Sequence, residues 1–179
     1  LVKIDNDIPF EHAALFGCGV VTGVGAVINT ANAREEDSVA IVGLGGVGLS
    51  ALLASMAVGS KKTIAIDLSD EKLTLARELG ADHTLNPKDE NFLEEMRDLT
   101  FGGANIAIET AGSGRALETA YEITRRGGTT VAAGMPGPVV NITLSHLSIA
   151  AEERVLKGSY MGSCVAQRDI PKYLDMFQT

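Results

Sequence analysis

The sequence is short of basic residues. Its 15 lysines and arginines stand against 23 aspartates and glutamates, so the formal net charge is −8. Binding along a nucleic-acid backbone needs lysine and arginine side chains that displace counterions, and docking on an anionic membrane needs a basic surface. The charge balance therefore argues against both kinds of partner.

The sequence also lacks any apolar run long enough to cross a bilayer. Residues 1–7 have neither the basic start nor the apolar core of a signal peptide, and no methionine opens the chain, so we expect a fragment of a longer protein. The only cysteines, Cys18 and Cys164, do not make a disulfide framework, and this predicts a reducing, cytoplasmic compartment.

The remaining composition is that of a globular protein with a real core. Hydrophobic residues make up 45% of the chain and charged residues 21%. A length of 179 residues suits one domain. We therefore expect a single domain over residues 1–179, in which a lead-in segment, residues 1–33, precedes a sheet domain, residues 34–179.

Short β-branched runs alternate with helical stretches along the chain. Strands are predicted at residues 39–42, 63–66, 83–85, 105–109, 129–133 and 155–159, with a short edge strand at 139–144. Helices are predicted at residues 47–58, 70–79, 92–99, 116–126 and 169–177, and a further helix within 10–33. Ser69 is the expected N-cap of the second helix, and glycines at 80 and 127–128 are expected to end helices. Two successive βαβαβ halves predict an α/β fold, a doubly wound parallel sheet of the Rossmann type.

A glycine-rich turn follows the first predicted strand. Gly43-Leu44-Gly45-Gly46-Val47-Gly48 has the G-x-G-x-x-G pattern and opens a predicted helix. In dinucleotide-binding proteins the first glycine permits the turn, the second admits a pyrophosphate and the third lets helix and strand pack closely. The helix N-terminus then offers N–H groups and a positive dipole end to the phosphates. The alternative is a tight turn that binds no ligand.

Asp67 ends the second predicted strand, about the distance beyond the glycines at which the dinucleotide fingerprint places an acidic residue. A carboxylate there can accept hydrogen bonds from the adenosine ribose and repels the 2′-phosphate of NADP, so it predicts NAD. Lys72, in the next helix, could add a hydrogen bond to the ribose. The alternatives are a turn-capping aspartate and a solvated lysine.

Cys18 has no partner in the sequence with the spacing of a metal site. A lone cysteine is more often a small buried hydrophobe than a ligand, and a zinc site needs at least three protein ligands. Neither Cys164 nor the three histidines supply them: His12, His83 and His146. This chain is therefore not expected to assemble a zinc site by itself.

Three ordered motifs resemble those of the zinc-containing medium-chain alcohol dehydrogenases. The segment at 17–26, GCGVVTGVGA, is similar to the family's G-C-G-x-x-T-G-x-G-A, and residues 42–50 resemble its cofactor loop. Residues 78–82, followed by Asn86-Pro87, resemble the pattern after the second crossover helix. Quinone-reductase-like relatives, which have no zinc, usually lack the cysteine of the first motif, so the cysteine favours the zinc-bearing branch of the family. The segment at 162–164 is similar to class III-like or actinobacterial-type members.

The resemblance implies a role for each matching residue. Cys18 matches a ligand of the catalytic zinc, which acts as a Lewis acid on the alcohol oxygen, and Thr22 matches a threonine near the nicotinamide. Asp67 and Lys72 match contacts to the adenosine ribose. The remaining cofactor contacts fall on the pyrophosphate loop and on later strand ends: Gly43, Gly45, Gly46, Val47, Gly48, Ala111, Ala133 and Gly134.

The resemblance also implies what this piece is. The family's other catalytic ligands, a cysteine and a histidine, belong to an N-terminal catalytic domain that also carries a structural zinc lobe. The chain is therefore expected to be the NAD-binding domain excised from a two-domain enzyme that moves hydride between an alcohol or aldehyde and NAD. Zinc is expected in the parent only, and this piece alone should be inactive.

The sequence leaves two other functions open: a non-catalytic dinucleotide-sensing module, and a methyltransferase that binds S-adenosylmethionine through a similar loop. The sequence does not indicate which alcohol the parent uses, or whether NAD is held tightly. A homodimer is expected through the apolar edge strand around Ile142, because an unpaired strand edge invites pairing with its own copy.

Overall fold

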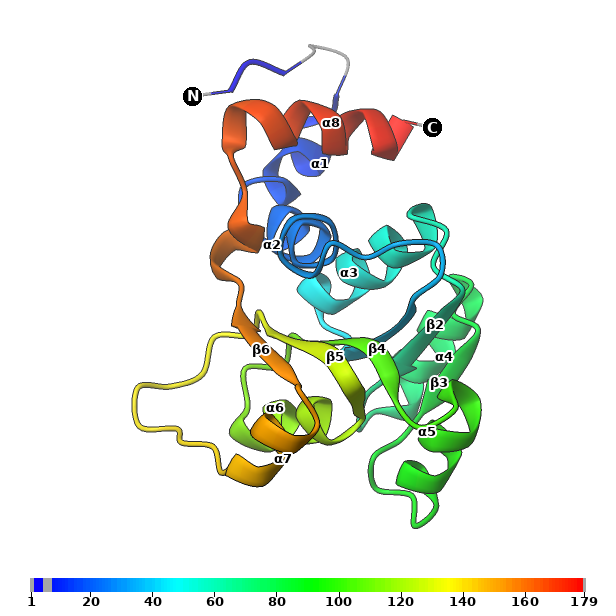
Figure 1. Cartoon of the computed structure of the whole chain (residues 1–179). Helices are drawn as coiled ribbons and strands as arrows, with labels where there is room; N and C mark the ends of the chain where they lie inside the picture. Colours follow the sequence, from blue (N-terminus) through cyan, green and yellow to red (C-terminus); the bar gives the residue numbers. More distant parts are fainter. Residues whose placement is uncertain (1, 5–7, 179) are drawn as a thin grey trace.

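A parallel sheet with helices on both faces forms the body of the molecule (Figure 1). The computed structural model describes residues 2–4 and 8–178. Its six strands follow the order β3-β2-β1-β4-β5-β6, and every neighbouring pair is parallel. The order reverses between β1 and β4, as in the doubly wound dinucleotide fold. The predicted fold class is confirmed.

Strands that helices cover on both sides are apolar runs, whereas the last strand of the sheet is exposed. The bounds of the strands are β1 (Ser38–Val42), β2 (Lys62–Ile66), β3 (His83–Leu85), β4 (Ala104–Glu109), β5 (Thr124–Ala132) and β6 (Val155–Gly158). Val42 lies opposite Ile66 on one side and Glu109 on the other, so the carboxyl ends of the central strands are level. Residues just beyond these ends therefore share one edge of the sheet.

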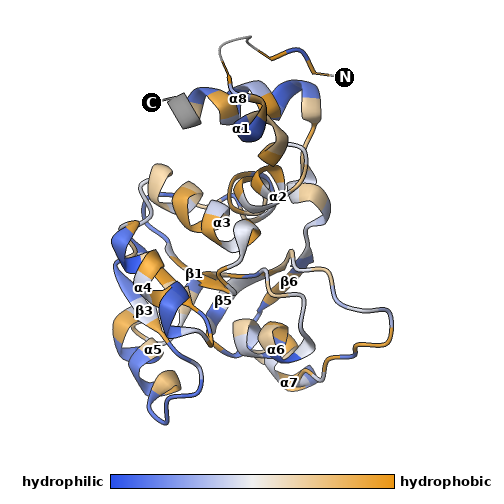
Figure 2. Cartoon of the chain, turned by 180° about the vertical axis from the view of Figure 1, so that it is seen from behind, coloured by the Kyte–Doolittle hydropathy of each residue, from blue (hydrophilic) through white to orange (hydrophobic). Residues whose placement is uncertain are grey.

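Alternate side chains of the central strands feed two separate cores. Val39 and Ile41 pack with α3 (Gly46–Ala57) and α4 (Asp70–Glu78) on one face. Ala40 and Val42 pack with α5 (Phe92–Thr100) and α6 (Gly114–Glu122) on the other. Figure 2 shows the strands between the helix layers, with hydrophilic residues on α4 and a largely apolar α3. No helix among the described residues is long and apolar enough to cross a membrane.

The lead-in segment is helical, in three pieces. These are α1 (Phe10–Leu15), α2 (Gly19–Gly25) and a π-helix, η1 (Ala26–Ala31), which ends at Asn32 with φ 55°. Gly23 lets α2 cross α3 closely, since a Cβ there would lie 2.2 Å from the Val47 carbonyl oxygen. After β6 the chain returns to this layer through η2 (Tyr160–Ser163) and α8 (Ala166–Gln178). The segment that carries Cys18 and Thr22 therefore packs on the helix that the glycine turn opens.

The predicted edge strand at residues 139–144 is wrong. Residues 133–145 form an irregular loop, in which Pro136 and Pro138 offer no N–H to a ladder. The Thr143 N–H donates to the Glu118 carboxylate of α6 at 2.8 Å, and Ile142 packs near Gly114 at the start of that helix. A contact with α6 thus takes the place of strand pairing, and a short helix, α7 (His146–Ala151), leads into β6 at the edge of the sheet.

The helix predicted at 116–126 ends at Glu122, and the glycines at 127–128 lie inside β5 instead of ending a helix. Ala104 pairs with Thr124 but Ile106 pairs with Thr129, so a bulge in β5 absorbs the residues between. Ser69 is at the N-cap of α4, as predicted, but its side chain makes no capping hydrogen bond. Gly80 follows the end of α4 with φ 104°, the conformation expected of a helix-ending glycine.

Candidate functional site

The glycine turn joins β1 to α3 at the carboxyl edge of the sheet. Gly43 has φ 97°, which an L-residue rarely adopts, and its N–H donates to the Ile66 carbonyl at 2.8 Å. A Cβ on Gly48 would lie 1.8 Å from the Gly43 carbonyl oxygen, so a side chain there would push the helix off the turn. At Gly45 and Gly46 a Cβ would meet no atom within 4 Å. Two glycines thus build the turn, and two leave its outer face open to a ligand.

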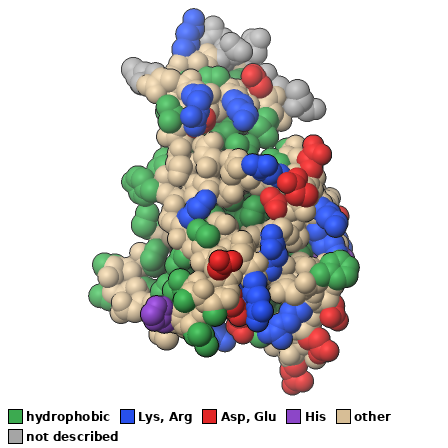
Figure 3. Space-filling view, viewed as in Figure 1, with side chains coloured by type: hydrophobic (Ala, Val, Ile, Leu, Met, Phe, Trp, Pro, Cys, Tyr) green, Lys and Arg blue, Asp and Glu red, His purple; other side chains and the backbone are tan. Residues whose placement is uncertain are grey.

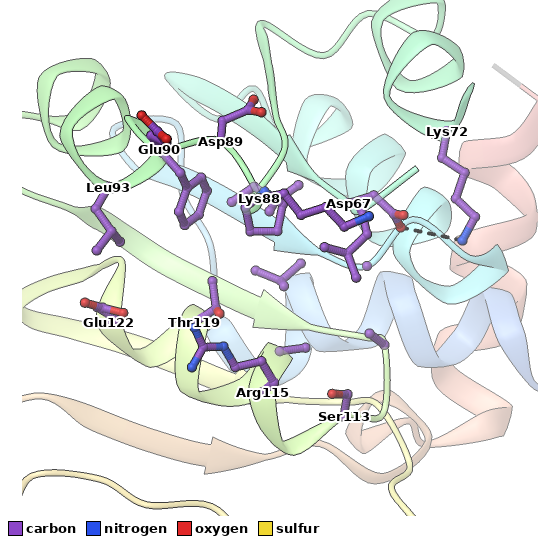
Figure 4. Close-up of a pocket in the computed structure, with 18 residues that line it drawn as sticks. Asp67, Lys72, Lys88, Asp89, Glu90, Leu93, Ser113, Arg115, Thr119 and Glu122 are labelled. Atoms are coloured by element: carbon purple, nitrogen blue, oxygen red, sulfur yellow. Dashed lines mark ion pairs between the residues drawn. The ribbon is translucent and has the colours of Figure 1, made fainter. Parts of the chain in front are cut away.

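Asp67 braces this turn and keeps room for another partner. Its Oδ2 accepts a 2.7 Å hydrogen bond from the Leu44 N–H, and its Oδ1 accepts one of 3.0 Å from the Ser69 N–H. The Lys72 ammonium lies 3.5 Å from Oδ2 (dashed line in Figure 4). Because a carboxylate has about four acceptor positions, capacity is left for ribose hydroxyls. The turn-capping role and the binding role are therefore compatible.

A cleft of about 630 Å³ opens beside Asp67 on the α5 and α6 side of the sheet (Figure 4). Asp67 and Lys72 stand at one end, and Arg115 and Thr119 of α6 face Lys88 and Leu93 across it. Such a volume suits a small-molecule site. Its apolar wall could take the flat face of a base, and it is made of Val42, Ile66, Pro87, Phe92, Leu93 and Ala116.

The ends of β4 and β5 meet the glycine turn from the other side. Thr110 donates from its hydroxyl to the Gly43 carbonyl at 2.6 Å, and a Cβ on Gly43 would lie 2.8 Å from that of Ala111. The N–H groups of Ala133 and Gly134 donate to the Glu109 carbonyl at 2.8 and 2.9 Å. The structure therefore brings the turn and the predicted residues Ala111, Ala133 and Gly134 to one edge.

The side chain of Glu109 is buried at this edge, with the residue 2% exposed. Its Oε1 accepts from the Gly112 N–H at 2.6 Å and from the Ser113 N–H at 3.4 Å. Burial raises the pKa of the carboxyl above its ordinary value, while hydrogen bonds from backbone N–H groups oppose the shift. Loss of hydration thus outweighs these bonds.

Thr22 lies within α2, and Cys18 is the N-cap residue of that helix. The Thr22 hydroxyl donates to the Cys18 carbonyl at 2.8 Å and lies 3.9 Å from the Met161 sulfur. Cys18 itself is exposed and carries a free thiol. Within residues 2–4 and 8–178, no three histidine, cysteine, aspartate or glutamate side chains gather as metal ligands. Because catalytic zinc takes three protein ligands, these residues alone do not fit the metal.

Sequence reasoning missed Glu109, Thr110 and Arg115. Glu109 offered a weak signal, since it is a carboxylate at the end of an otherwise apolar predicted strand. Thr110 and Arg115 offered none, because their importance depends on which loop or cleft the fold places beside them.

Comparisons with known proteins agree with this geometry. Residues 46–179 match a family model described as "Zinc-binding dehydrogenase". Similar relatives are geraniol dehydrogenase of Castellaniella defragrans, 37% identical, and S-(hydroxymethyl)glutathione dehydrogenase of Paracoccus denitrificans, 33% identical. The alignments cover 97% and 99% of this chain but 47% and 49% of those proteins.

A solved structure shows the same fold. Benzyl alcohol dehydrogenase from Acinetobacter calcoaceticus superposes with a TM-score of 0.95 at 32% identity, over 99% of this chain and 49% of that one. The chain therefore spans about half the length of the proteins that it matches.

Proposed function

Because this chain belongs to the zinc-binding dehydrogenase family, we propose that it is the NAD-binding part of a zinc-dependent alcohol dehydrogenase. The single observation that carries the proposal is the open glycine turn at the N-terminus of α3, with the Asp67 carboxylate beside it. In the parent, hydride would pass between an alcohol or aldehyde and NAD.

The residues present fit a dinucleotide. The turn leaves Gly45 and Gly46 uncovered beside the N-terminus of α3, where backbone N–H groups and the helix dipole favour a pyrophosphate. Val47 and Gly48 form the first turn of that helix. Asp67 and Lys72 would hold the adenosine ribose, and the adjoining cleft would take the adenine. When bound, NAD supplies the hydride acceptor; this chain binds and orients it.

The second half of the site would hold the nicotinamide. Ala111, Ala133 and Gly134 lie at the carboxyl ends of β4 and β5, on the far side of the strand-order reversal from Asp67. A dinucleotide bound across that crevice extends over both halves of the fold. Thr22 is proposed to lie near the nicotinamide, and Cys18 to provide one zinc ligand in the parent.

Titration of the chain with nucleotides tests the proposal. We expect NADH to bind at least about tenfold more tightly than NADPH, because a carboxylate facing the 2′-phosphate should cost about 1.4 kcal/mol or more. S-adenosylmethionine should not compete with NADH. Equal affinities for NADH and NADPH would overturn the cofactor assignment, and preferential binding of S-adenosylmethionine would indicate a methyltransferase instead.

A non-catalytic dinucleotide-sensing module is the alternative, since it would use the same turn and the same cleft. The family match and the alcohol dehydrogenases among the relatives favour the enzyme. Reconstituting the chain with the segment that precedes it in its parent, and assaying alcohol oxidation with NAD, distinguishes the two.

We also propose a homodimer in which β6, in place of the predicted strand at residues 139–144, pairs with its own copy. This strand closes one side of the sheet, all four of its residues are exposed, and apolar side chains of the neighbouring loop and α7 are exposed beside it. Figure 3 shows apolar side chains on this flank of the molecule.

A cytoplasmic location is proposed from the two free thiols, because reducing compartments keep cysteines unpaired.

A further inference from the structure

Glu109 joins two loops that are far apart in the sequence. On the first loop, the Gly112 and Ser113 N–H groups donate to its Oε1 at 2.6 and 3.4 Å. On the second loop, the Gly134 N–H donates to its main-chain carbonyl at 2.9 Å. The first loop follows β4 and the second follows β5. One buried residue thus contacts both loops, with its carboxylate bonded to the first and packed against Gly134 of the second.

The fit at this junction is close. A Cβ on Gly134 would lie 2.2 Å from the Gly112 nitrogen and 2.8 Å from Oε1 of Glu109. By contrast, a Cβ on Gly137, three residues further along the same loop, would meet nothing within 4 Å. The contact is therefore specific to the part of the loop that lies against the carboxylate.

Burying a carboxylate here costs stability. The raised pKa means that burial disfavours the ionised form by more than the backbone hydrogen bonds favour it. No charged side chain is among the causes of that shift, so the described part of the chain gives Glu109 no ion-pair partner to offset the cost. An apolar residue would avoid the cost of burying a charge but would leave the Gly112 N–H without its acceptor, so what the carboxylate provides is the arrangement of this loop.

We propose that Glu109 is a positioning residue for the nicotinamide half of the cofactor, holding the loops after β4 and β5 in the arrangement that this half requires. The proposal rests on the proposed function, since it assumes that the cofactor is a dinucleotide with its adenosine half at Asp67. Glu109 does not itself touch the cofactor; it acts through the backbone of residues 111–113 and 134.

A positioning role for Glu109 should affect binding of the nicotinamide half of the dinucleotide more than binding of the adenosine half. The adenosine half contacts β1, β2 and the glycine turn, on which the Glu109 carboxylate has no hydrogen-bond partner among the described residues. Glu109→Gln keeps the size of the side chain and one oxygen in the place of Oε1, but it removes the negative charge that strengthens the hydrogen bonds from Gly112 and Ser113. We therefore expect the affinity for NADH to fall about tenfold, whereas the affinity for AMP changes less than about twofold.

The experiment compares NADH and AMP titrations of the full 179-residue chain and of four variants. Gly134→Ala disturbs the junction from the other loop and should repeat the loss for NADH alone. Gly137→Ala is its matched control, and Glu36→Gln, an exposed residue before β1, is the matched control for the loss of one charge; neither should change either affinity. Gly134→Ala keeps the proposal testable if Glu109→Gln fails to fold.

Each outcome supports or overturns the positioning role of Glu109. Loss of NADH affinity with AMP affinity unchanged supports the positioning role, and so does an NADH affinity that falls on acidification in the wild type but not in Glu109→Gln. Equal loss for both nucleotides, or no loss for either, overturns it while leaving the proposed function standing. Failure of the wild-type chain to bind NADH overturns the proposed function, and this inference with it.

Discussion

The Asp67 carboxylate accepts a 2.7 Å hydrogen bond from the backbone N–H of Leu44, the second residue of the glycine turn. The end of β2 therefore fixes the shape of the turn that follows β1. The side chain that would read the ribose also sets the loop that would take the pyrophosphate. A change at Asp67 should act on both parts of the cofactor at once.

Replacing Asp67 with alanine should lower the NADH affinity and narrow the gap between NADH and NADPH. The variant loses the ribose acceptor and the brace on Leu44, and it removes the charge that repels a 2′-phosphate. Calorimetric titration of both nucleotides measures the ratio. Asp67→Asn is the control, since it removes the charge but keeps one oxygen for a backbone N–H. An unchanged ratio in both variants would remove Asp67 from cofactor selection.

Gly48→Ala and Gly45→Ala should separate folding from binding. A Cβ at Gly48 meets the Gly43 carbonyl at 1.8 Å, and overpacking of this kind typically costs about 1–3 kcal/mol of unfolding free energy. A Cβ at Gly45 meets no atom within 4 Å, so this variant should unfold like the wild type and yet bind NADH more weakly. Urea unfolding and NADH titration of both variants check this. A Gly45→Ala chain that binds normally would show that the open face is not where the pyrophosphate lies.

The pKa of Glu109 predicts a pH dependence of stability. Burial raises the folded-state pKa above the ordinary value of 4.5, so the folded protein binds this proton more strongly than the unfolded chain does. The stabilisation is fully present below about the ordinary value and is lost as pH rises through the raised, folded-state pKa.

The wild type should therefore lose stability relative to Glu109→Gln across that interval as pH increases. Urea unfolding of both proteins at a series of pH values gives the difference, in which the contributions of distant carboxyls cancel. If the unfolding free energy of the wild type minus that of Glu109→Gln stayed constant or became more positive as pH rises, the raised pKa would be contradicted.

The chain alone should neither oxidise alcohols nor retain stoichiometric zinc. Cys18 is at most one of the three protein ligands that a catalytic site needs, and it is exposed. Elemental analysis after dialysis against a weak chelator measures the zinc content, and Cys18→Ser serves as the control. One zinc per chain that is lost in Cys18→Ser would mean that additional ligands exist.

The sequence predicted the layers of the fold because its strongest signals are local. Each buried parallel strand is an apolar run, and the glycine pattern marks the first strand-to-helix turn. The proposed cofactor-binding residues in that turn, and Asp67 after β2, are predicted from the same spacing. Where propensity, pattern and turn chemistry agree, local reading is sufficient to place an element.

The misses share one cause, which is that contacts distant in sequence decide the outcome. Residues 139–144 alternate like a strand, but a hydrogen bond from Thr143 to Glu118 holds them against α6. The glycines at 127–128 resemble a helix stop, yet a bulge in β5 takes them into the sheet. The role of Glu109 depends on a loop that begins more than twenty residues later.

The dimer prediction now concerns the outer edge of β6. The Ser159 N–H, just past the strand, donates to the Ala132 carbonyl of β5. Because N–H groups alternate along a strand, the Leu156 N–H points away from β5, toward the open edge. Leu156→Pro removes that outward donor but spares the ladder to β5, and proline is tolerated on an edge strand.

If two copies pair antiparallel through β6, Leu156→Pro should shift the chain from dimer to monomer at micromolar concentration, while Leu156→Ala, which keeps the N–H, should shift it less. Sedimentation of the wild type and both variants measures this, and urea unfolding checks that the fold survives. A wild type that is already monomeric contradicts edge pairing in this chain. A dimer that withstands Leu156→Pro places the interface elsewhere, with the exposed apolar side chains of Leu147 and Ile149 on α7 as the next surface to change.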